Sequence, residues 1–221
     1  MSVRRILGPA GLALVLALAS GCDRIVDAVP SVGALLERAD GPPPAAAILA
    51  TLSRPGLAPF GSEQLVAVLE RRDVAAVLLP GPTVAGTTTW IAADATTVSV
   101  RHDGLVVATR GLAPDLMRAD LSEIASALDA GAGPATRVHR HLDGLDREVV
   151  AAYACRIRTE GPGTVTILGR AIPALHLTER CANGRVRFRN DYWRDRTGRY
   201  VRSRQWIGEE AGHIRLEYIG P

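Results

Sequence analysis

Arginines alternate with other residues in two stretches near the end of the chain. Residues two apart on a β-strand point to the same face, so each stretch would align its arginines on one side of a sheet. In this alternation Tyr200 and Trp206 share a face with the arginines of their stretch. Guanidinium groups bind carboxylates or phosphates through paired hydrogen bonds, and aromatic rings stack on sugars. The candidate surface for an anionic polysaccharide comprises Arg185, Arg187, Arg189, Tyr200, Arg202, Arg204 and Trp206. The alternative is a solvated outer face whose arginine stems cover apolar neighbours.

A second set of polar residues could bind a metal ion. His139, His141 and Asp143 are two residues apart, so a strand would place all three on one face. Imidazole and carboxylate are zinc ligands, but a site also needs matched geometry and supporting contacts. We therefore favour a polar, solvated strand face and expect no metal.

Motifs for catalysis are absent from the sequence. It contains no GxSxG, HExxH, glycine-rich phosphate loop or CxxC. Carboxylates are plentiful, so the sequence does not exclude a pair of catalytic carboxylates like that of a glycosidase, but no pattern singles out two of them. We expect a protein that is not an enzyme and needs no cofactor, and we rank a polysaccharide-modifying enzyme last.

The first 21 residues are typical of a secretory signal peptide. Arg4 and Arg5 precede an apolar run over residues 12–19, which is too short to span a bilayer. The sequence Leu-Ala-Ser-Gly-Cys over residues 18–22 matches a lipobox, in which Cys22 is lipidated and becomes the first residue of the mature chain. The alternative is an ordinary secretion signal. We expect one domain over residues 22–221, held on a membrane by its lipid.

Removal of the signal peptide changes the charge of the protein. All 26 basic residues are arginines, and with 23 acidic residues they give the full chain a net charge of +3. Loss of Arg4 and Arg5 lowers this to about +1 over the remaining 200 residues. A near-neutral domain argues against nucleic acid as a partner.

Two of the three cysteines remain after lipidation. Disulfides persist outside the cytoplasm, so we predict that Cys155 and Cys181 are joined. In the chain-entropy model, a loop of about 26 residues contributes roughly 3–4 kcal/mol. Two buried free thiols are the alternative.

The elements that would hold these residues are mostly strands. Asp103-Gly104 and Asn183-Gly184 lie between strand-like runs and predict tight hairpins, and residues 195–198 predict a four-residue loop. Many strands joined by tight turns, with no alternation of strands and helices, indicate one antiparallel sheet system. We expect a break between strands at residues 161–163.

Few helices are expected. Apolar spacing suggests short helices over residues 23–38. Asp120 and Glu123 fit a capping box at the start of a helix that Gly131 ends. Three tryptophans, Trp90, Trp193 and Trp206, are expected in or beside the core.

The C-terminal stretch Asn190–Gly208, NDYWRDRTGRYVRSRQWIG, resembles the YjbF family of GfcB-like group 4 capsule polysaccharide lipoproteins. The shared pattern is N-x-(F/Y)-W-x-D-x-x-(T)-G-x-(V)-x-x-S-x-Q. Weaker matches lie at Trp90, residues 103–106, residues 109–112 and residues 115–116, and the lipobox also fits. The resemblance covers nearly the whole mature chain.

This resemblance implies a large curved antiparallel sheet, or half-barrel, with short helices on its concave side. It implies a periplasm-facing lipoprotein that assists secretion or assembly of capsule or exopolysaccharide, with export proteins as partners and no catalytic residues. Outer-membrane placement is favoured, although Asp23 after the lipidated cysteine is a retention signal for the inner membrane in some bacteria. The alternative is a carrier of lipid or acyl chains on the concave face.

Overall fold

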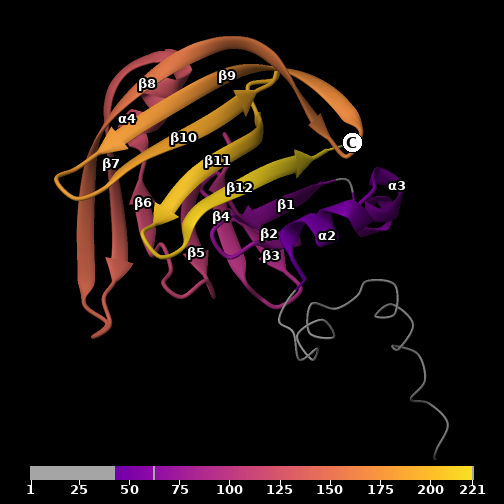
Figure 1. Cartoon of the computed structure of the whole chain (residues 1–221), viewed down its shortest axis with the longest axis horizontal. Coiled ribbons are helices and arrows are strands. Elements are labelled where there is room, and N and C mark those ends of the chain that lie inside the picture. The colour runs from indigo at the N-terminus through magenta and orange to yellow at the C-terminus, as the bar shows by residue number, and fades with distance from the viewer. Residues whose placement is uncertain (1–42, 62, 221) are drawn as a thin grey trace, which may run out of the picture.

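The computed structural model describes residues 43–61 and 63–220, so the expected signal peptide, Cys22 and the expected helices of residues 23–38 lie outside it. Twelve antiparallel strands form one sheet in the order β5-β4-β3-β2-β1-β12-β11-β10-β9-β8-β7-β6 (Figure 1). The strands are β1 (Gln64–Leu69), β2 (Val74–Val84), β3 (Thr87–Ala92), β4 (Thr97–Arg101), β5 (Val106–Arg110), β6 (Arg118–Asp120), β7 (Ala132–Leu142), β8 (Glu148–Ile167), β9 (Arg170–Ala182), β10 (Arg187–Arg194), β11 (Tyr200–Gly208) and β12 (Gly212–Ile219).

The sheet curls until its two edge strands, β5 and β6, approach each other (Figure 1). The backbone N–H of Thr109 at the end of β5 donates to the Leu116 carbonyl at 2.9 Å. The N–H of Met117 donates to the Arg140 carbonyl of β7, also at 2.9 Å. The segment between β5 and β6 therefore bridges the two edges. The expected large curved antiparallel sheet is confirmed, in the form of a nearly closed half-barrel.

The inner core fills the concave side. Helix α4 (Ser122–Asp129) buries Ile124 and Leu128 in the same cluster as inward-facing strand residues such as Leu177 and Ile214. The expected helix is present, but its expected cap is wrong. The helix begins at Ser122, one residue later than a cap at Asp120 would give, and Asp120 accepts from the N–H of Ser122 at 3.2 Å. Glu123 does not complete a capping box, because it accepts a hydrogen bond from the N–H of Thr136 on β7.

A second core lies on the opposite face of the sheet. It contains Leu57, Val66, Val165 and Val201, and it is covered by α2 (Ala45–Thr51), α3 (Arg54–Leu57) and η2 (Ala58–Phe60). The end of the β8–β9 hairpin also packs there through Ile167. The helices therefore cover both faces of the sheet, and not the concave face alone.

The turn predictions from sequence are confirmed with one exception. Gly104 has a φ of 97°, in the hairpin between β4 and β5, and Asn183-Gly184 connects β9 to β10. The expected break at residues 161–163 is wrong, because β8 continues through it with a register shift between Thr159 and Gly161. Beyond Arg158, β7 no longer pairs with β8, and an edge strand tolerates a proline such as Pro162.

Candidate functional site: an arginine row on the outer face

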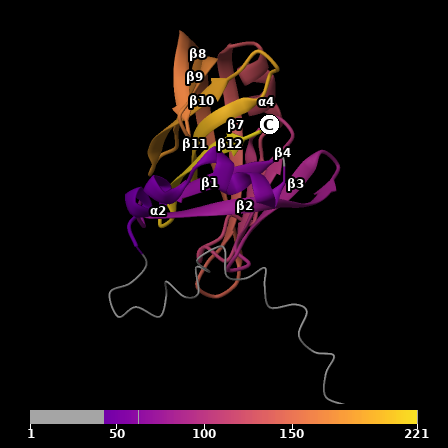
Figure 2. The ribbon, with the colours of Figure 1, turned by 90° about the vertical axis from the view of Figure 1, so that its right-hand side faces the viewer.

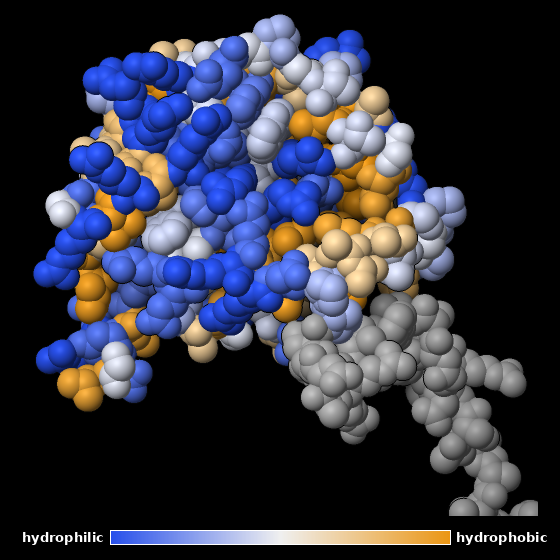
Figure 3. All heavy atoms as spheres, in the orientation of Figure 1, coloured by the Kyte–Doolittle hydropathy of each residue, from blue (hydrophilic) through white to orange (hydrophobic). Residues whose placement is uncertain are grey.

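Three arginines face one another across the outer surface of β8, β9 and β10. Arg156 is directly opposite Arg180, and Arg180 is directly opposite Arg189. Arg156 and Arg180 are exposed, while Arg189 is partly covered. Figure 3 shows this face as largely hydrophilic. Like charges directly opposite on neighbouring strands destabilise a sheet, so this row favours an anion that neutralises it.

The arginines on this face divide into paired and unpaired groups. Arg189 binds Asp191 at 2.7 Å, Arg202 binds Glu217 at 2.9 Å and Arg204 binds Glu70 at 2.7 Å. Five other exposed arginines, on β8, β10 and the end of β9 with its following turn, have no ion pair or side-chain hydrogen bond to another described residue. That unpaired group is Arg156, Arg158, Arg180, Arg185 and Arg187. The uncompensated positive charge therefore lies over the β8–β10 side of the face.

An aromatic pair borders the row. The rings of Trp193 on β10 and His176 on β9 stack at 4.7 Å between centroids, with planes only 2° apart. His176 Nε2 lies 2.8 Å from an Asp191 oxygen, and the Arg202 guanidinium lies 6.0 Å from the Trp193 ring. Trp193 is half-buried, so sugars could contact this pair at the edge of the charged row.

Two aromatic residues of the sequence-derived surface are not on this face. Tyr200 points inward, is buried, and lies against Tyr192 with ring centroids 5.1 Å apart. The expectation that it shares a face with Arg202 and Arg204 is wrong, because the register shifts at the end of β10 where the hairpin closes.

Trp206 also leaves the arginine face. Its backbone N–H donates to the Asn190 side chain at 2.7 Å in place of a regular ladder bond, so the two strands separate there. Its ring stacks on Phe188 at 5.3 Å and packs against the inner core. An aromatic ring turned inward cannot stack on a ligand bound to the outer row.

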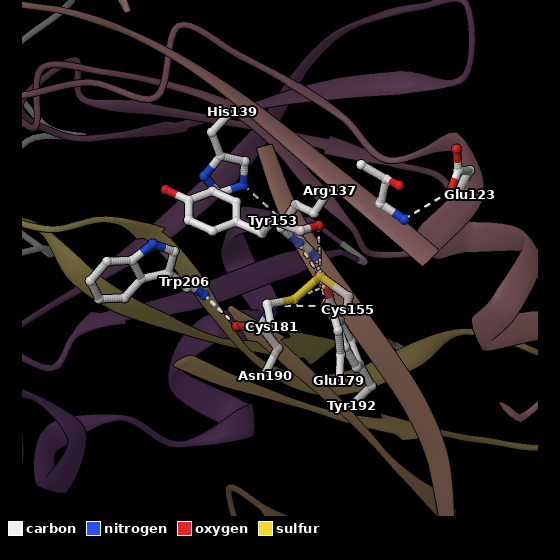
Figure 4. Close-up of a disulfide and its surroundings, with 11 residues drawn as sticks. Glu123, Arg137, His139, Tyr153, Cys155, Glu179, Cys181, Asn190, Tyr192 and Trp206 are labelled. Carbon is white, nitrogen blue, oxygen red and sulfur yellow. Dashed lines mark hydrogen bonds and ion pairs between the residues drawn. A yellow bond between two sulfur atoms is a disulfide. The ribbon is translucent and has the colours of Figure 1, made fainter. Parts of the chain in front are cut away.

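A buried polar cluster lies on the inner side of the same strands (Figure 4). Arg137 on β7 donates to both oxygens of Glu179 on β9, each at 2.8 Å. Glu179 also accepts from the Tyr192 hydroxyl at 2.6 Å and the Asn190 amide at 2.9 Å, both on β10. The cluster joins β7, β9 and β10 and so holds the outer row in register.

Burial and pairing oppose each other in this cluster. Burial alone would lower the pKa of Arg137, but the Glu179 carboxylate and the Tyr192 hydroxyl outweigh it and raise that pKa. Burial alone would raise the pKa of Glu179, but Arg137 and the hydrogen bonds from Asn190 and Tyr192 lower it. Both partners therefore stay charged inside the protein.

The disulfide between Cys155 and Cys181 is present, with an S–S distance of 2.06 Å. It joins β8 to β9 at directly opposed positions, one residue from Arg156 and Arg180. Cys181 Sγ lies 3.0 Å from Glu179, so the disulfide and the buried cluster are in contact (Figure 4). Among the described residues, Cys155, Glu179 and Cys181 are the group close enough to share a metal, and the disulfide occupies both sulfurs.

The three residues of the candidate metal set do not come together as a ligand group, although the rings of His139 and His141 meet edge to face with centroids 5.8 Å apart. His139 is fully buried. Its pKa is held well below the ordinary 6.5, mainly by burial and then by the charges of Arg137 and His141. His141 donates through Nδ1 to the Asp115 carbonyl at 2.9 Å, and Asp143 pairs with Arg147 in the following turn. The expected solvated strand face is therefore wrong for His139, which packs against Tyr153 inside the sheet.

Arg189 of the row was predicted from sequence, but Arg156 and Arg180 were missed, although a signal for their pairing existed. The predicted disulfide implies that Cys155 and Cys181 are neighbours on adjacent strands, which places Arg156 opposite Arg180. A two-residue Asn183-Gly184 turn would place Arg180 opposite Arg187, whereas the observed loop spans residues 183–186 and places Arg180 opposite Arg189. The two local predictions together would therefore have given the Arg156–Arg180 pair but not the third member of the row.

Three comparisons place the chain among known proteins. The family model for YjbF, group 4 capsule polysaccharide lipoprotein gfcB, matches residues 48–219. No curated protein sequence matches. A solved structure described as the hypothetical lipoprotein YmcC from Escherichia coli (K12) is similar over 80% of this chain and 93% of that one, with 17% identity and a TM-score of 0.67. That likeness supports the half-barrel fold. Separately, none of the described helices has the length and hydrophobicity needed to cross a membrane. The family match covers most of the chain, which therefore belongs to the YjbF family of group 4 capsule polysaccharide lipoproteins.

Proposed function

We propose that this protein is a lipid-anchored, periplasm-facing component of capsule or exopolysaccharide export that binds an anionic polymer without modifying it. The observation that carries the proposal is the in-register row of Arg156, Arg180 and Arg189. The family match supports a capsule-related role. The placement of Cys22 in a lipobox supports the anchor, with export or assembly proteins as partners.

The spacing of the row suits a polymer better than a small anion. Neighbouring strands lie roughly 4.7–4.9 Å apart, so the face presents one arginine per strand at a regular interval. A chain of acidic sugars would offer carboxylates repeatedly along its length. Exposed ion pairs are individually weak, so several contacts in a row are needed for useful affinity.

The carboxylates on this face favour binding over catalysis. Asp191 is held by Arg189 and His176, Glu217 by Arg202 and Glu70 by Arg204. A glycosidase needs one carboxyl that can give up a proton and one that is free to act as base or nucleophile. These three carboxylates, bound to guanidinium groups, suit neither role, and Glu160, which accepts a hydrogen bond from the Thr178 hydroxyl at 2.8 Å, is one carboxylate where a glycosidase needs two.

The acyl-carrier alternative has weaker support. An apolar cavity of about 190 Å³ lies at one end of the half-barrel, lined mainly by side chains such as Ala67, Leu78, Ala92, Val98 and Ile214. Ligand pockets are usually roughly 300–1,000 Å³. The space fits only a fragment of an acyl chain.

The test compares two variants of equal charge. The mature protein is titrated with polygalacturonate, an acidic polysaccharide, and with neutral dextran, at low and high salt. The row variant Arg156→Gln/Arg180→Gln is set against a control, Arg118→Gln/Arg196→Gln, which removes two exposed arginines elsewhere. Two contacts worth roughly 0.7 kcal/mol each correspond to about a tenfold loss of affinity in the row variant.

Three results would contradict the binding proposal. They are equal affinity of the row and control variants, binding of dextran as strong as that of polygalacturonate, and no weakening by salt. Membrane fractionation tests the location separately. We favour the outer membrane, and recovery of the lipidated protein with inner membranes would assign Asp23 the role of a retention signal.

A further inference from the structure

The β7–β8 hairpin ends in a ribbon that extends beyond the rest of the sheet (Figure 1). On one side, β6 reaches only to Arg140 of β7. On the other side, β9 ends at Ala182, opposite Ala154 of β8. The two strands nevertheless continue to pair with each other as far as Leu142 and Glu148. The end of the hairpin is therefore two-stranded and unsupported by neighbouring strands.

Apolar side chains concentrate on this ribbon. Seven large hydrophobic side chains are exposed among the described residues, and four of them lie here. Leu142 is 39% exposed, Leu145 73%, Val149 47% and Val150 51%. Leu145 is in the turn, and Val149 and Val150 point to opposite faces of their strand. Exposed apolar side chains therefore occur on both faces of the ribbon and at its tip, an arrangement that is unfavourable in water and typical of a surface that meets another apolar phase.

The turn presents Leu145 rigidly and nearly without net charge. Asp143 Oδ1 accepts from the N–H groups of Leu145 at 2.9 Å and of Arg147 at 3.0 Å. Asp143 also pairs with the Arg147 side chain at 2.7 Å, and Arg140 pairs with Glu148. These pairs neutralise four charges and leave the exposed Asp146, next to Leu145, as one acidic charge, so the tip carries no basic excess that would demand an acidic partner.

The topology places this tip at the end of the sheet where the described chain starts. In an antiparallel sheet, every second turn along the chain lies at the same end, so the turns that follow odd-numbered strands here share one end. The β7–β8 turn therefore shares an end with the β1–β2 turn. The N–H of Ala45, three residues into the described chain, donates to the Asp73 carbonyl of that β1–β2 turn at 2.8 Å. Figure 1 and Figure 2 both show the hairpin tip and the start of α2 on the same side.

We infer that the β7–β8 tip, through Leu142, Leu145, Val149 and Val150, contacts the lipid surface on which the protein is anchored. The inference rests on the proposed lipid anchor at Cys22, which leaves 20 residues between the lipid and Pro43. A membrane held there faces the end where the described chain begins. Contact by the tip turns the opposite end of the half-barrel away from the bilayer.

The experiment uses the lipidated mature protein in phosphatidylcholine vesicles. Leu145→Cys is labelled with an environment-sensitive fluorophore, and Arg196→Cys, in the β10–β11 turn at the opposite end, is labelled as the control. The native Cys155 and Cys181 are joined and do not react. We expect a blue shift at position 145, with quenching by lipids that carry a quencher near the headgroup, and a water-like signal at position 196. Circular dichroism checks that both variants are folded.

Each result has a defined meaning. A water-like label at position 145 on protein that floats with the vesicles overturns the inference and leaves the anchor intact. Failure of the protein to float overturns the anchor, and with it this inference. A blue shift that appears in native envelope membranes but not in pure lipid also overturns it, and assigns the tip to a protein partner.

Discussion

Replacing Glu179 by glutamine is expected to destabilise the protein severely. Arg137 is 1% exposed and Glu179 is fully buried, and two hydrogen bonds of 2.8 Å join them. Glutamine keeps the shape and still accepts hydrogen bonds from Tyr192 and Asn190, but it removes the negative charge. Arg137 would then be a buried charge without a counter-ion.

The structure sets the size of the effect. Breaking a buried ion pair by removing one partner costs roughly 3–5 kcal/mol. For a protein of this length that corresponds to a fall in Tm of about 6–20 °C. Removing both charges with Arg137→Met/Glu179→Gln should be less harmful than Glu179→Gln alone, because no uncompensated charge remains.

Urea unfolding at neutral pH, with the disulfide intact, measures the free energy of unfolding of each variant. The control is Glu148→Gln, which removes an exposed carboxylate whose ion pair with Arg140 is on the surface. We expect the control to lose at most about 1 kcal/mol. The reasoning is refuted if Glu179→Gln loses no more than the control, or if the double variant is less stable than the single one.

Two further predictions concern the same region. Because burial, Arg137 and His141 hold the pKa of His139 well below 6.5, only the unfolded state gains a proton there as the pH falls below that value. The free energy of unfolding should then fall by up to about 1.4 kcal/mol per pH unit. If the His139→Phe variant loses stability with falling pH as steeply as the unchanged protein, this prediction is contradicted. Reducing the disulfide between Cys155 and Cys181 should lower the free energy of unfolding by roughly 3 kcal/mol, so equal urea midpoints with and without reductant would argue against a stabilising role.

Local chemistry explains the parts of the fold that were predicted correctly. Asp103-Gly104 and Asn183-Gly184 adopt turns that need positive φ or a short polar side chain, and these requirements depend only on neighbouring residues. The disulfide followed from compartment and cysteine count. The family resemblance supplied the curved sheet, which turn patterns alone could not distinguish from other antiparallel folds.

The errors share one physical cause, which is that long-range packing overrides local preference. Glu123 fits a capping box, yet its carboxylate bonds to Thr136 because β7 passes beside α4. Gly161 and Pro162 resemble a break, yet β8 continues because β9 pairs with it on one side. Trp206 has the alternation of an outer residue, yet it packs inward where β10 and β11 separate.

The sequence by itself predicts a leader and a lipid site at Cys22, and it determined the cysteine pairing, the main hairpins and the family. Each depends on a short motif or on a count of residues. Only the tertiary structure decided that Arg137 and Glu179 form a buried pair, and that Arg156, Arg180 and Arg189 align on the outer face. It also decided that the β7–β8 tip extends beyond its neighbours. Burial and alignment are set by strand register and by where neighbouring strands end, and those depend on the closure of the whole sheet.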